Sequence, residues 1–255
     1  MLFSIITICK NIEKSFETTA DSIINQNFKD FEWIVIDGGS NQISLNSIEK
    51  YKKNFAHYES ENDKGIYDAM NKGLARASGD YILFMNGGDA FFDNNVLGII
   101  HSNIFIDAGI DVFYGNVCVA YTSFFKFKKA RNFYHFSTSL PTSHQSFIIN
   151  KKAIATSFFD ISYKYCADFN MIYNLFHLNH KFKKINVTIA TVVAGGVSDV
   201  NRIAAIEECR TIVMQRNCTI GTKILFTFAI SKANLILYFK RVFNKSFVEF
   251  VTKYK

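Results

Sequence analysis

The chain has 255 residues, of which 49% are hydrophobic and 20% are charged, and its formal net charge is +7 at pH 7. This length and apolar content exclude a disordered or fibrous chain and predict one large α/β domain or a domain with an appendage. The charge is concentrated near the C-terminus, because the segment from Gly221 onward has seven Lys and Arg residues against one acid, Glu249, and so carries +6. The rest of the chain is almost neutral, so we predict no nucleic-acid binding by the main domain.

Apolar runs alternate with helical patterns through the first half of the chain. Residues 2–9 ("LFSIITIC") and 31–37 ("FEWIVID") predict buried strands, and Asn11–Gln26 between them predicts a helix. This βαβ order is typical of an α/β protein. The elements expected next are a weaker helix near 43–54, a short strand at 57–61, a helix over 66–77 and a buried strand at 80–86.

The second half has a more mixed pattern. Residues 111–136 alternate in part and predict strands or a hairpin. The only proline, Pro141, opens a loop that leads into a strand. Asp168–His180 predicts a helix, residues 183–198 predict a strand that ends in a glycine turn, and Asn201–Arg216 predicts a further helix.

No membrane-spanning segment is expected from the sequence. The N-terminal apolar run reaches a lysine within ten residues and has no basic leader, which is too short for a signal peptide or a membrane span. The longest later run, Ile224–Phe239, is interrupted by Lys232. The five cysteines include no CxxC pair, so the sequence indicates neither a disulfide framework nor a thiolate metal site.

The C-terminal segment has an amphipathic pattern. At 3.6 residues per turn its aromatic and apolar side chains fall on one helical face, whereas Arg241, Lys245 and Lys253 fall outside that face. Such a basic amphipathic helix suits an anionic membrane surface. The alternative is that the stripe packs on the main domain or on a second subunit. The stripe consists of Phe239, Phe243, Phe247, Phe250, Val251 and Tyr254.

Several aspartates stand where predicted elements stop, with glycines beside them. Asp37 and Asp89 follow buried strands in "VIDGGS" and "FMNGGD". Asp and Gly are poor in helix or strand interiors and good in turns. Because α/β proteins bind ligands at the carboxyl ends of their strands, these residues indicate a site there.

These motifs are similar to the inverting family-two glycosyltransferases of the GT-A fold. "SIITICKN", "FEWIVIDGGS", "ESENDKGIYDAMNKGLARASGDYILFMNGGD", "HQSF", "CADFNM" and "GGVS" occur in the order and spacing of that family. The sequence most resembles the bacterial group that builds O-antigen, capsule and exopolysaccharide, over residues 1–198. The resemblance implies an α/β fold with a Rossmann-like central mixed sheet flanked by helices, followed by an amphipathic helical extension.

The resemblance also implies a division of the chain. Residues 1–200 would form the GT-A catalytic domain, with a nucleotide-sugar-binding half at 1–110 and an acceptor-binding half at 111–200. Residues 201–255 would form a basic helical extension that associates with a membrane. The implied donor-binding residues are Thr7, Asn11, Asp37, Asp63, Lys64, Asp68, Asn71, Asn86, Gly87 and Asp89, and the implied acceptor or donor-sugar contacts are His144, Gln145 and Gly196.

Two carboxylates carry the implied chemistry. Asp89 occupies the position of the metal-binding DxD-type motif and would hold Mn²⁺ or Mg²⁺, although Asn86 and Gly88 replace aspartates of other members. Asp168 in "CADFNM" occupies the position of the catalytic base, which takes the proton of the acceptor hydroxyl. From the residues alone, Asp89 could instead be a turn residue and Asp168 a helix N-cap.

The implied activity is transfer of a hexose or N-acetylhexosamine from a UDP-sugar to a saccharide acceptor. The acceptor would be carried on an undecaprenyl-type lipid, and the protein would be cytoplasmic and peripheral on the inner face of the cell membrane, with a homo-oligomer also conceivable. A dehydrogenase is disfavoured because "TICKNIEKS" lacks GxGxxG. A nucleotidyltransferase is disfavoured because it would need a Gly-rich basic signature there. The remaining alternatives are a glycoside hydrolase and an inactive GT-A scaffold of a polysaccharide assembly complex.

Overall fold

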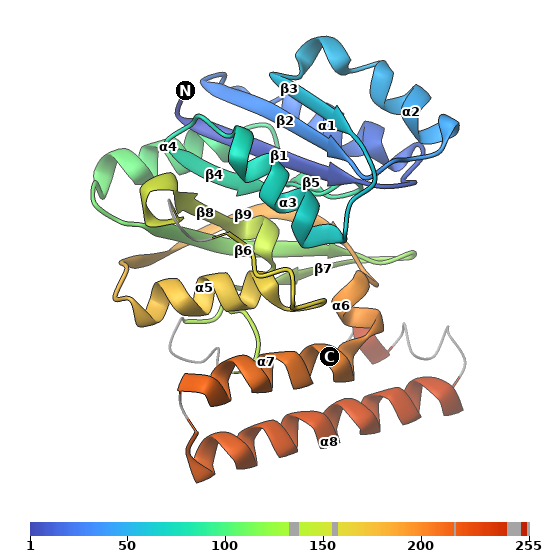
Figure 1. Cartoon of the computed structure of the whole chain (residues 1–255), viewed down its shortest axis with the longest axis vertical. Coiled ribbons are helices and arrows are strands. Elements are labelled where there is room, and N and C mark those ends of the chain that lie inside the picture. Colours follow the sequence, from blue (N-terminus) through green and yellow to red (C-terminus); the bar gives the residue numbers. More distant parts are fainter. Residues whose placement is uncertain (133–137, 155–157, 217, 244–250, 254–255) are drawn as a thin grey trace.

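The protein is described here by a computed structural model that covers residues 1–132, 138–154, 158–216, 218–243 and 251–253. A mixed sheet runs through the upper part of the molecule, and α7 (Arg202–Arg216) and α8 (Ile220–Val242) form a pair of helices below it (Figure 1). Helix α5 (Ala167–His177) lies between the sheet and this pair (Figure 1).

The sheet has the strand order β3-β2-β1-β4-β8-β6-β9-β5, and β7 pairs with β6. The first four strands of this order are mutually parallel, and β8 then joins β4 and β6 in antiparallel fashion. The mixed sheet expected from the resemblance is thus confirmed. The strands are β1 (Phe3–Cys9), β2 (Phe31–Asp37), β3 (His57–Ser60), β4 (Tyr81–Phe84), β5 (Ala90–Phe91), β6 (Val112–Ala120), β7 (Phe125–Lys128), β8 (Phe147–Asn150) and β9 (Phe182–Val193).

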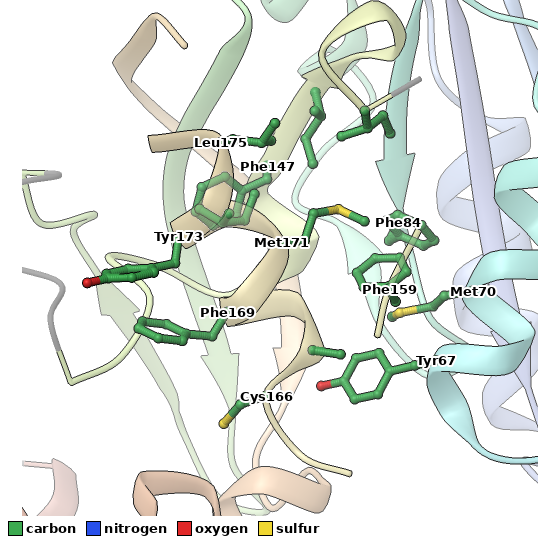
Figure 2. Packing of buried hydrophobic residues seen from close by; sticks show 14 of the residues in the cluster. Tyr67, Met70, Phe84, Phe147, Phe159, Cys166, Phe169, Met171, Tyr173 and Leu175 are labelled. Atoms are coloured by element: carbon green, nitrogen blue, oxygen red, sulfur yellow. The ribbon is translucent and has the colours of Figure 1, made fainter. Parts of the chain in front are cut away.

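Helices cover both faces of this sheet, which explains why its central strands β1 and β4 are buried along their whole length. In β1, Ile5 belongs to a core with α1, whereas Ile6 belongs to a second core with α3 and α5. Figure 2 shows part of this second core, in which Phe159 lies among Tyr67, Met70 and Phe84. The remaining helices are α1 (Ser15–Ile24), α2 (Gln42–Glu49), α3 (Ile66–Arg76), α4 (Val96–Ile106) and α6 (Val197–Val200).

Two expectations on the helices need correction. The first helix begins at Ser15 and not at Asn11, because Asn11 and Glu13 have φ angles of 52° and 46°, which a right-handed helix excludes. The helix α4 was not expected from the sequence. Its mean hydropathy is high and its apolar residues are spread around the helix, so it has no polar face to reveal a helical period.

The C-terminal segment contains one helix that is long and apolar enough to cross a membrane. This segment is Ile220–Phe239, and 17% of an 18-residue apolar stretch within it is buried inside the protein. The sequence-based expectation of no such segment relied on Lys232, but one or two charges do not disqualify a helix of this length. Half of the predicted aromatic stripe lies outside the described residues, namely Phe247, Phe250 and Tyr254.

Helix α7 is part of the main core and not a separate extension. Its residues Ala205, Ile206, Cys209 and Ile212 are buried in the same core as α5. The carboxylate of Glu208 on α7 accepts hydrogen bonds from three successive backbone N–H groups before α5, those of residues 164–166, at 2.7–3.0 Å. The domain boundary expected at residue 200 therefore separates helices that pack together.

Candidate active site

The parallel strands bring three predicted segments to one edge of the sheet. The backbone N–H of Gly38 donates to the carbonyl of Cys9 at 2.8 Å, and that of Gly87 donates to Ile8 at 2.9 Å. Asn11 joins the same edge, because its side-chain oxygen accepts from the N–H of Asn41 at 2.8 Å. The ends of β1, β2 and β4 therefore form a continuous rim, as expected for an α/β ligand site.

Asp37 organises the loop at this rim. It is fully buried, and its carboxylate accepts from the N–H of Ser40 at 3.0 Å, from the hydroxyl of Ser60 at 2.6 Å and from the hydroxyl of Ser40. The structure thus gives Asp37 a role in capping this loop. Its predicted contact with a nucleotide base stays a prediction.

An acidic cluster around Lys72 follows β3. The Lys72 ammonium lies 2.6 Å from Asp63, 2.5 Å from Glu61 and 3.6 Å from Asp68. The hydrogen bonds that the Lys72 ammonium donates to Asp63 and Glu61 raise the pKa of Lys72. Asp68 also accepts from the backbone N–H of Lys64 at 3.0 Å, which fixes the entry to α3. Asp63, Lys64 and Asp68 are therefore brought together, and Lys72 is the partner that sequence reasoning missed.

Two predicted donor-binding residues have structural roles in this conformation. Thr7 is fully buried, and its hydroxyl accepts from the Trp33 indole N–H at 2.9 Å. The side-chain amide of Asn71 is bound at both ends by the backbone of Phe159, at 2.8 and 2.9 Å. Their hydrogen-bonding groups are engaged within the protein in this conformation, and their predicted contacts with the donor stay predictions.

Asp89 is likewise turned inward. It is 9% exposed, and its carboxylate accepts from Gln145 Nε2 at 2.5 Å and from the Val193 N–H at 3.1 Å. Burial raises the pKa of the Asp89 carboxyl, whereas the N–H donors and nearby His144 favour the charged form. The amide nitrogen of Gln145 is therefore engaged by Asp89 in this conformation, and its predicted sugar contact stays a prediction. Asp89 instead joins the β4 end to β9 and to the loop before β8.

These residues do not fit a metal ion bound through Asp89. Both carboxylate oxygens are engaged with N–H donors, and the flanking positions hold Asn86 and Gly88, of which Gly88 has no side chain to ligate. Within the described ranges no group of three or more His, Cys, Asp or Glu residues could hold a metal ion. Gly87 serves packing, since a Cβ there would lie 2.2 Å from Ile12.

Asp168 is the centre of a hydrogen-bonded chain that joins the two halves of the domain. Its Oδ1 accepts from the Tyr67 hydroxyl at 3.1 Å, and its Oδ2 lies 3.4 Å from Nδ1 of His144. Nε2 of the same imidazole lies 2.9 Å from the amide nitrogen of Asn86. An amide N–H can only donate, so Nε2 accepts and Nδ1 carries the proton that faces Asp168.

Burial sets the protonation of the tyrosine in this chain. It raises the pKa of Tyr67, and the neighbouring Asp168 charge raises it further, so the phenol stays neutral and donates. Figure 2 shows Tyr67 on α3, facing the beginning of α5. The side chain of Asp168 keeps 19% of its surface exposed, so a ligand hydroxyl can reach it. Sequence reasoning missed Tyr67, although it stands within the quoted motif "GIYDAM".

We expect Tyr67→Phe to slow any reaction that uses Asp168 as a base. The substitution removes one hydrogen bond to the carboxylate and should lower turnover about tenfold. The measurement is a double-mutant cycle with Asp168→Asn, in which the Tyr67 substitution should have no further effect. Equal effects in both backgrounds would mean that Tyr67 acts only on the fold.

A cavity of ≈ 450 Å³ opens beside this chain. His144 and Asp168 line it together with residues of α7 and α8. Ser198 of α6 also lines it, whereas the predicted contact Gly196 is exposed next to it and begins α6. The cavity therefore has one wall that the sequence placed in a separate extension.

The fold and this site define a class of protein, the GT-A glycosyltransferases. The structure of TarS from S. aureus in complex with UDP-GlcNAc has a TM-score of 0.67 and 16% identity, covering 91% of this chain and 72% of that one. The mannosyltransferase PcManGT from Pyrobaculum calidifontis, in complex with GDP-Man and Mn²⁺, also has a TM-score of 0.67, at 11% identity, and covers 98% of this chain and 78% of that one.

The chain belongs to glycosyl transferase family 2, whose family model matches residues 4–176. A PGL/p-HBAD biosynthesis glycosyltransferase of Mycobacterium tuberculosis is 31% identical over 126 residues, which are 48% of this chain and 49% of that protein. A cholesterol galactosyltransferase of Borreliella burgdorferi is 31% identical over 101 residues, which are 39% of this chain and 28% of that protein. The chain thus matches about half the length of the first of these relatives, and neither match confirms the O-antigen or capsule group.

Proposed function

We propose that the protein is an inverting glycosyltransferase that moves a hexose or N-acetylhexosamine from a UDP-sugar to a hydroxyl of a lipid-linked saccharide, in bacterial surface polysaccharide synthesis. One observation carries this proposal. The Asn86–His144–Asp168–Tyr67 chain places a partly exposed carboxylate of the second half against the strand ends of the first. Such a carboxylate can serve both a donor at the rim and an acceptor in the cavity.

The chain's own residues then supply the base. Asp168 takes the proton of the acceptor hydroxyl while that oxygen forms a bond to the anomeric carbon, and the bond from this carbon to the UDP oxygen breaks. Attack opposite the leaving UDP inverts an α-linked donor to a β-linked product. His144 donates through Nδ1 and Tyr67 through its hydroxyl, so the two together hold the carboxylate in place.

Asn86 is well placed to contact the donor. Its Oδ1 is buried and accepts no hydrogen bond from any described residue, while its nitrogen faces His144. A buried acceptor without a donor is costly, and a sugar hydroxyl would satisfy it. This supports the predicted donor-binding role of Asn86. The proposed reaction uses no metal at Asp89.

The proposal is tested by calorimetric titration with UDP, with and without Mn²⁺, followed by a screen of UDP-sugars for UDP release. We expect saturable UDP binding and release of UDP from one sugar. Binding that requires Mn²⁺ would support the predicted Mn²⁺ or Mg²⁺ cofactor, held by groups other than Asp89. UDP binding without release from any sugar would favour the inactive scaffold, and binding of another nucleotide alone would replace UDP in the proposal.

Membrane association is part of this proposal and is supported by α8. One face of this helix carries large apolar side chains that are between 57% and 78% exposed. Basic residues such as Lys223 and Arg241 accompany them, which suits an anionic lipid surface. The exposed stripe of α8 consists of Ile220, Ile224, Phe228, Leu235, Tyr238 and Val242.

We expect a variant with Ile220, Ile224 and Leu235 all replaced by Ser to lose most binding to vesicles of phosphatidylglycerol and phosphatidylcholine. These side chains are exposed, so the fold should persist while the buried area in lipid is lost. Co-sedimentation measures the partitioning. The control is Phe105→Ser on α4, which is 82% exposed. Equal loss in this control, or undiminished binding of the triple variant, would contradict a membrane role of α8.

A further inference from the structure

The cavity beside Asp168 combines three kinds of surface. Its lining includes His144 and Asp168, three cations of separate elements, and apolar side chains of α8. The cations are Arg131, Arg202 and Lys232, and the apolar residues from α8 are Leu225, Phe228, Ala229, Ala233 and Ile236. This composition differs from that of a pocket for a neutral saccharide alone.

The cations of the cavity outnumber its carboxylates. Asp168 is the only acid among its lining residues within the described part of the chain. Arg131 donates to the carbonyls of Ser139 and Leu140 and not to an acid, and Lys232 forms no ion pair with a described residue. Arg202 has one acidic neighbour, Asp199, at 3.5 Å, and both side chains are more than half exposed.

Two of these cations, Arg131 and Arg202, lie close enough to affect each other. Burial lowers the pKa of Arg131, and the nearby Arg202 charge lowers it further. Burial likewise lowers the pKa of Lys128, and Lys126 and Arg202 oppose its charge, whereas Asp199 favours it. Like charges held together in this way are stabilised by an anion that bridges them.

The apolar wall connects the cavity to the outer surface of α8. Phe228 lines the cavity and is also 69% exposed in the stripe that includes Ile224 and Leu235. Apolar side chains of α8 therefore lie both on the proposed membrane surface and in the cavity, where they can contact a hydrocarbon chain.

We propose that this cavity binds an acceptor whose sugar is joined to a hydrocarbon chain through a phosphate or diphosphate, with Arg131, Arg202 and Lys232 holding the phosphate and α8 the chain. This inference rests on the proposed function and adds the chemistry of the acceptor linker and its location. The sugar hydroxyl then reaches Asp168 at the opposite end of the cavity. Residues of α7 and α8 thus serve as acceptor-binding residues and not only as an anchor.

The test measures binding of geranylgeranyl diphosphate to the full-length protein by calorimetry, below the critical micelle concentration. We expect 1:1 binding that excess UDP does not displace. Inorganic diphosphate and dodecyl maltoside, which each carry one half of the ligand chemistry, should bind at least about tenfold more weakly. Displacement by UDP would place the diphosphate at the nucleotide site, and equal binding of either half-ligand would remove the need for a joint site. Each of these outcomes overturns the proposal.

Variants locate the site. Arg202→Gln and Lys232→Gln should each weaken geranylgeranyl diphosphate binding by about tenfold, since each removes a charged hydrogen-bond donor. Lys223→Gln removes the same charge from α8 at an exposed position outside the cavity and should change the affinity less than about twofold. Equal weakening in all three would indicate a general charge effect and would overturn the assignment.

The same samples keep this inference separate from the proposed function. UDP titration of each variant should give the affinity of the unsubstituted protein, because the substituted cations belong to α7 and α8 and not to the loops that follow β1, β2 and β4. If UDP binds and is released from a UDP-sugar while geranylgeranyl diphosphate fails to bind, only the acceptor inference is wrong. If UDP itself fails to bind, the proposed function is wrong in naming a UDP-sugar as the donor.

Discussion

Asp168→Asn is expected to lower the rate of sugar transfer by about 10²–10⁴, because the substitution removes the base and leaves its neighbours in place. The asparagine oxygen can still accept from Tyr67 and from the N–H of Phe169, which now donate to Asp168 at 3.1 and 2.8 Å. The fold and the nucleotide site should therefore persist. The measurement is UDP release from the UDP-sugar that the screen identifies, together with calorimetric UDP binding.

The control for this variant is Asp160→Asn in the loop before α5. Asp160 is exposed and caps the N–H of Ser162 at 2.9 Å, so the same change of charge occurs near α5 but outside the site. We expect near-normal transfer by the control. A loss of UDP affinity as large as the loss of transfer in Asp168→Asn would show that Asp168 holds the donor and is not the base.

Asp89→Ala is expected to destabilise the protein by about 2–5 kcal/mol, an effect that does not depend on metal. It leaves Gln145 Nε2 and the Val193 N–H without their acceptor in a buried place, and each lost partner costs about 1–3 kcal/mol. Urea unfolding in EDTA and in Mn²⁺ should give the same loss. A metal-ligand role would predict normal stability in EDTA and a loss of Mn²⁺-dependent UDP binding alone.

Asp30→Ala is the matched control for this substitution. The carboxylate of Asp30 is 59% exposed and lies 4.0 Å from the N-terminal amine. Removing such an exposed carboxylate should change the free energy of unfolding by less than about 1 kcal/mol. If both variants unfold at the same urea concentration as the original protein, the structural role of Asp89 is wrong.

For the predicted aspartates, the place of the residue in the fold and the direction in which its carboxylate faces depend on different parts of the sequence. The "FMNGGD" and "CADFNM" motifs located Asp89 and Asp168 correctly at the ends of elements. Whether each carboxylate faces a ligand or the protein depends on partners far away in sequence. Asp89 is held by Val193, 104 residues later, and Asp168 by Tyr67, 101 residues earlier.

The sequence by itself determined the βαβ order, the mixed sheet and the family, because strand and helix periods and motif spacing are local properties of the chain. Tertiary structure decided which polar groups form hydrogen bonds within the protein, as those of Thr7 and Asn71 do, and which remain available to a ligand. It also decided that α7 and α8 share a cavity with Asp168. Such contacts depend on the burial of two distant segments against each other, which no local pattern encodes.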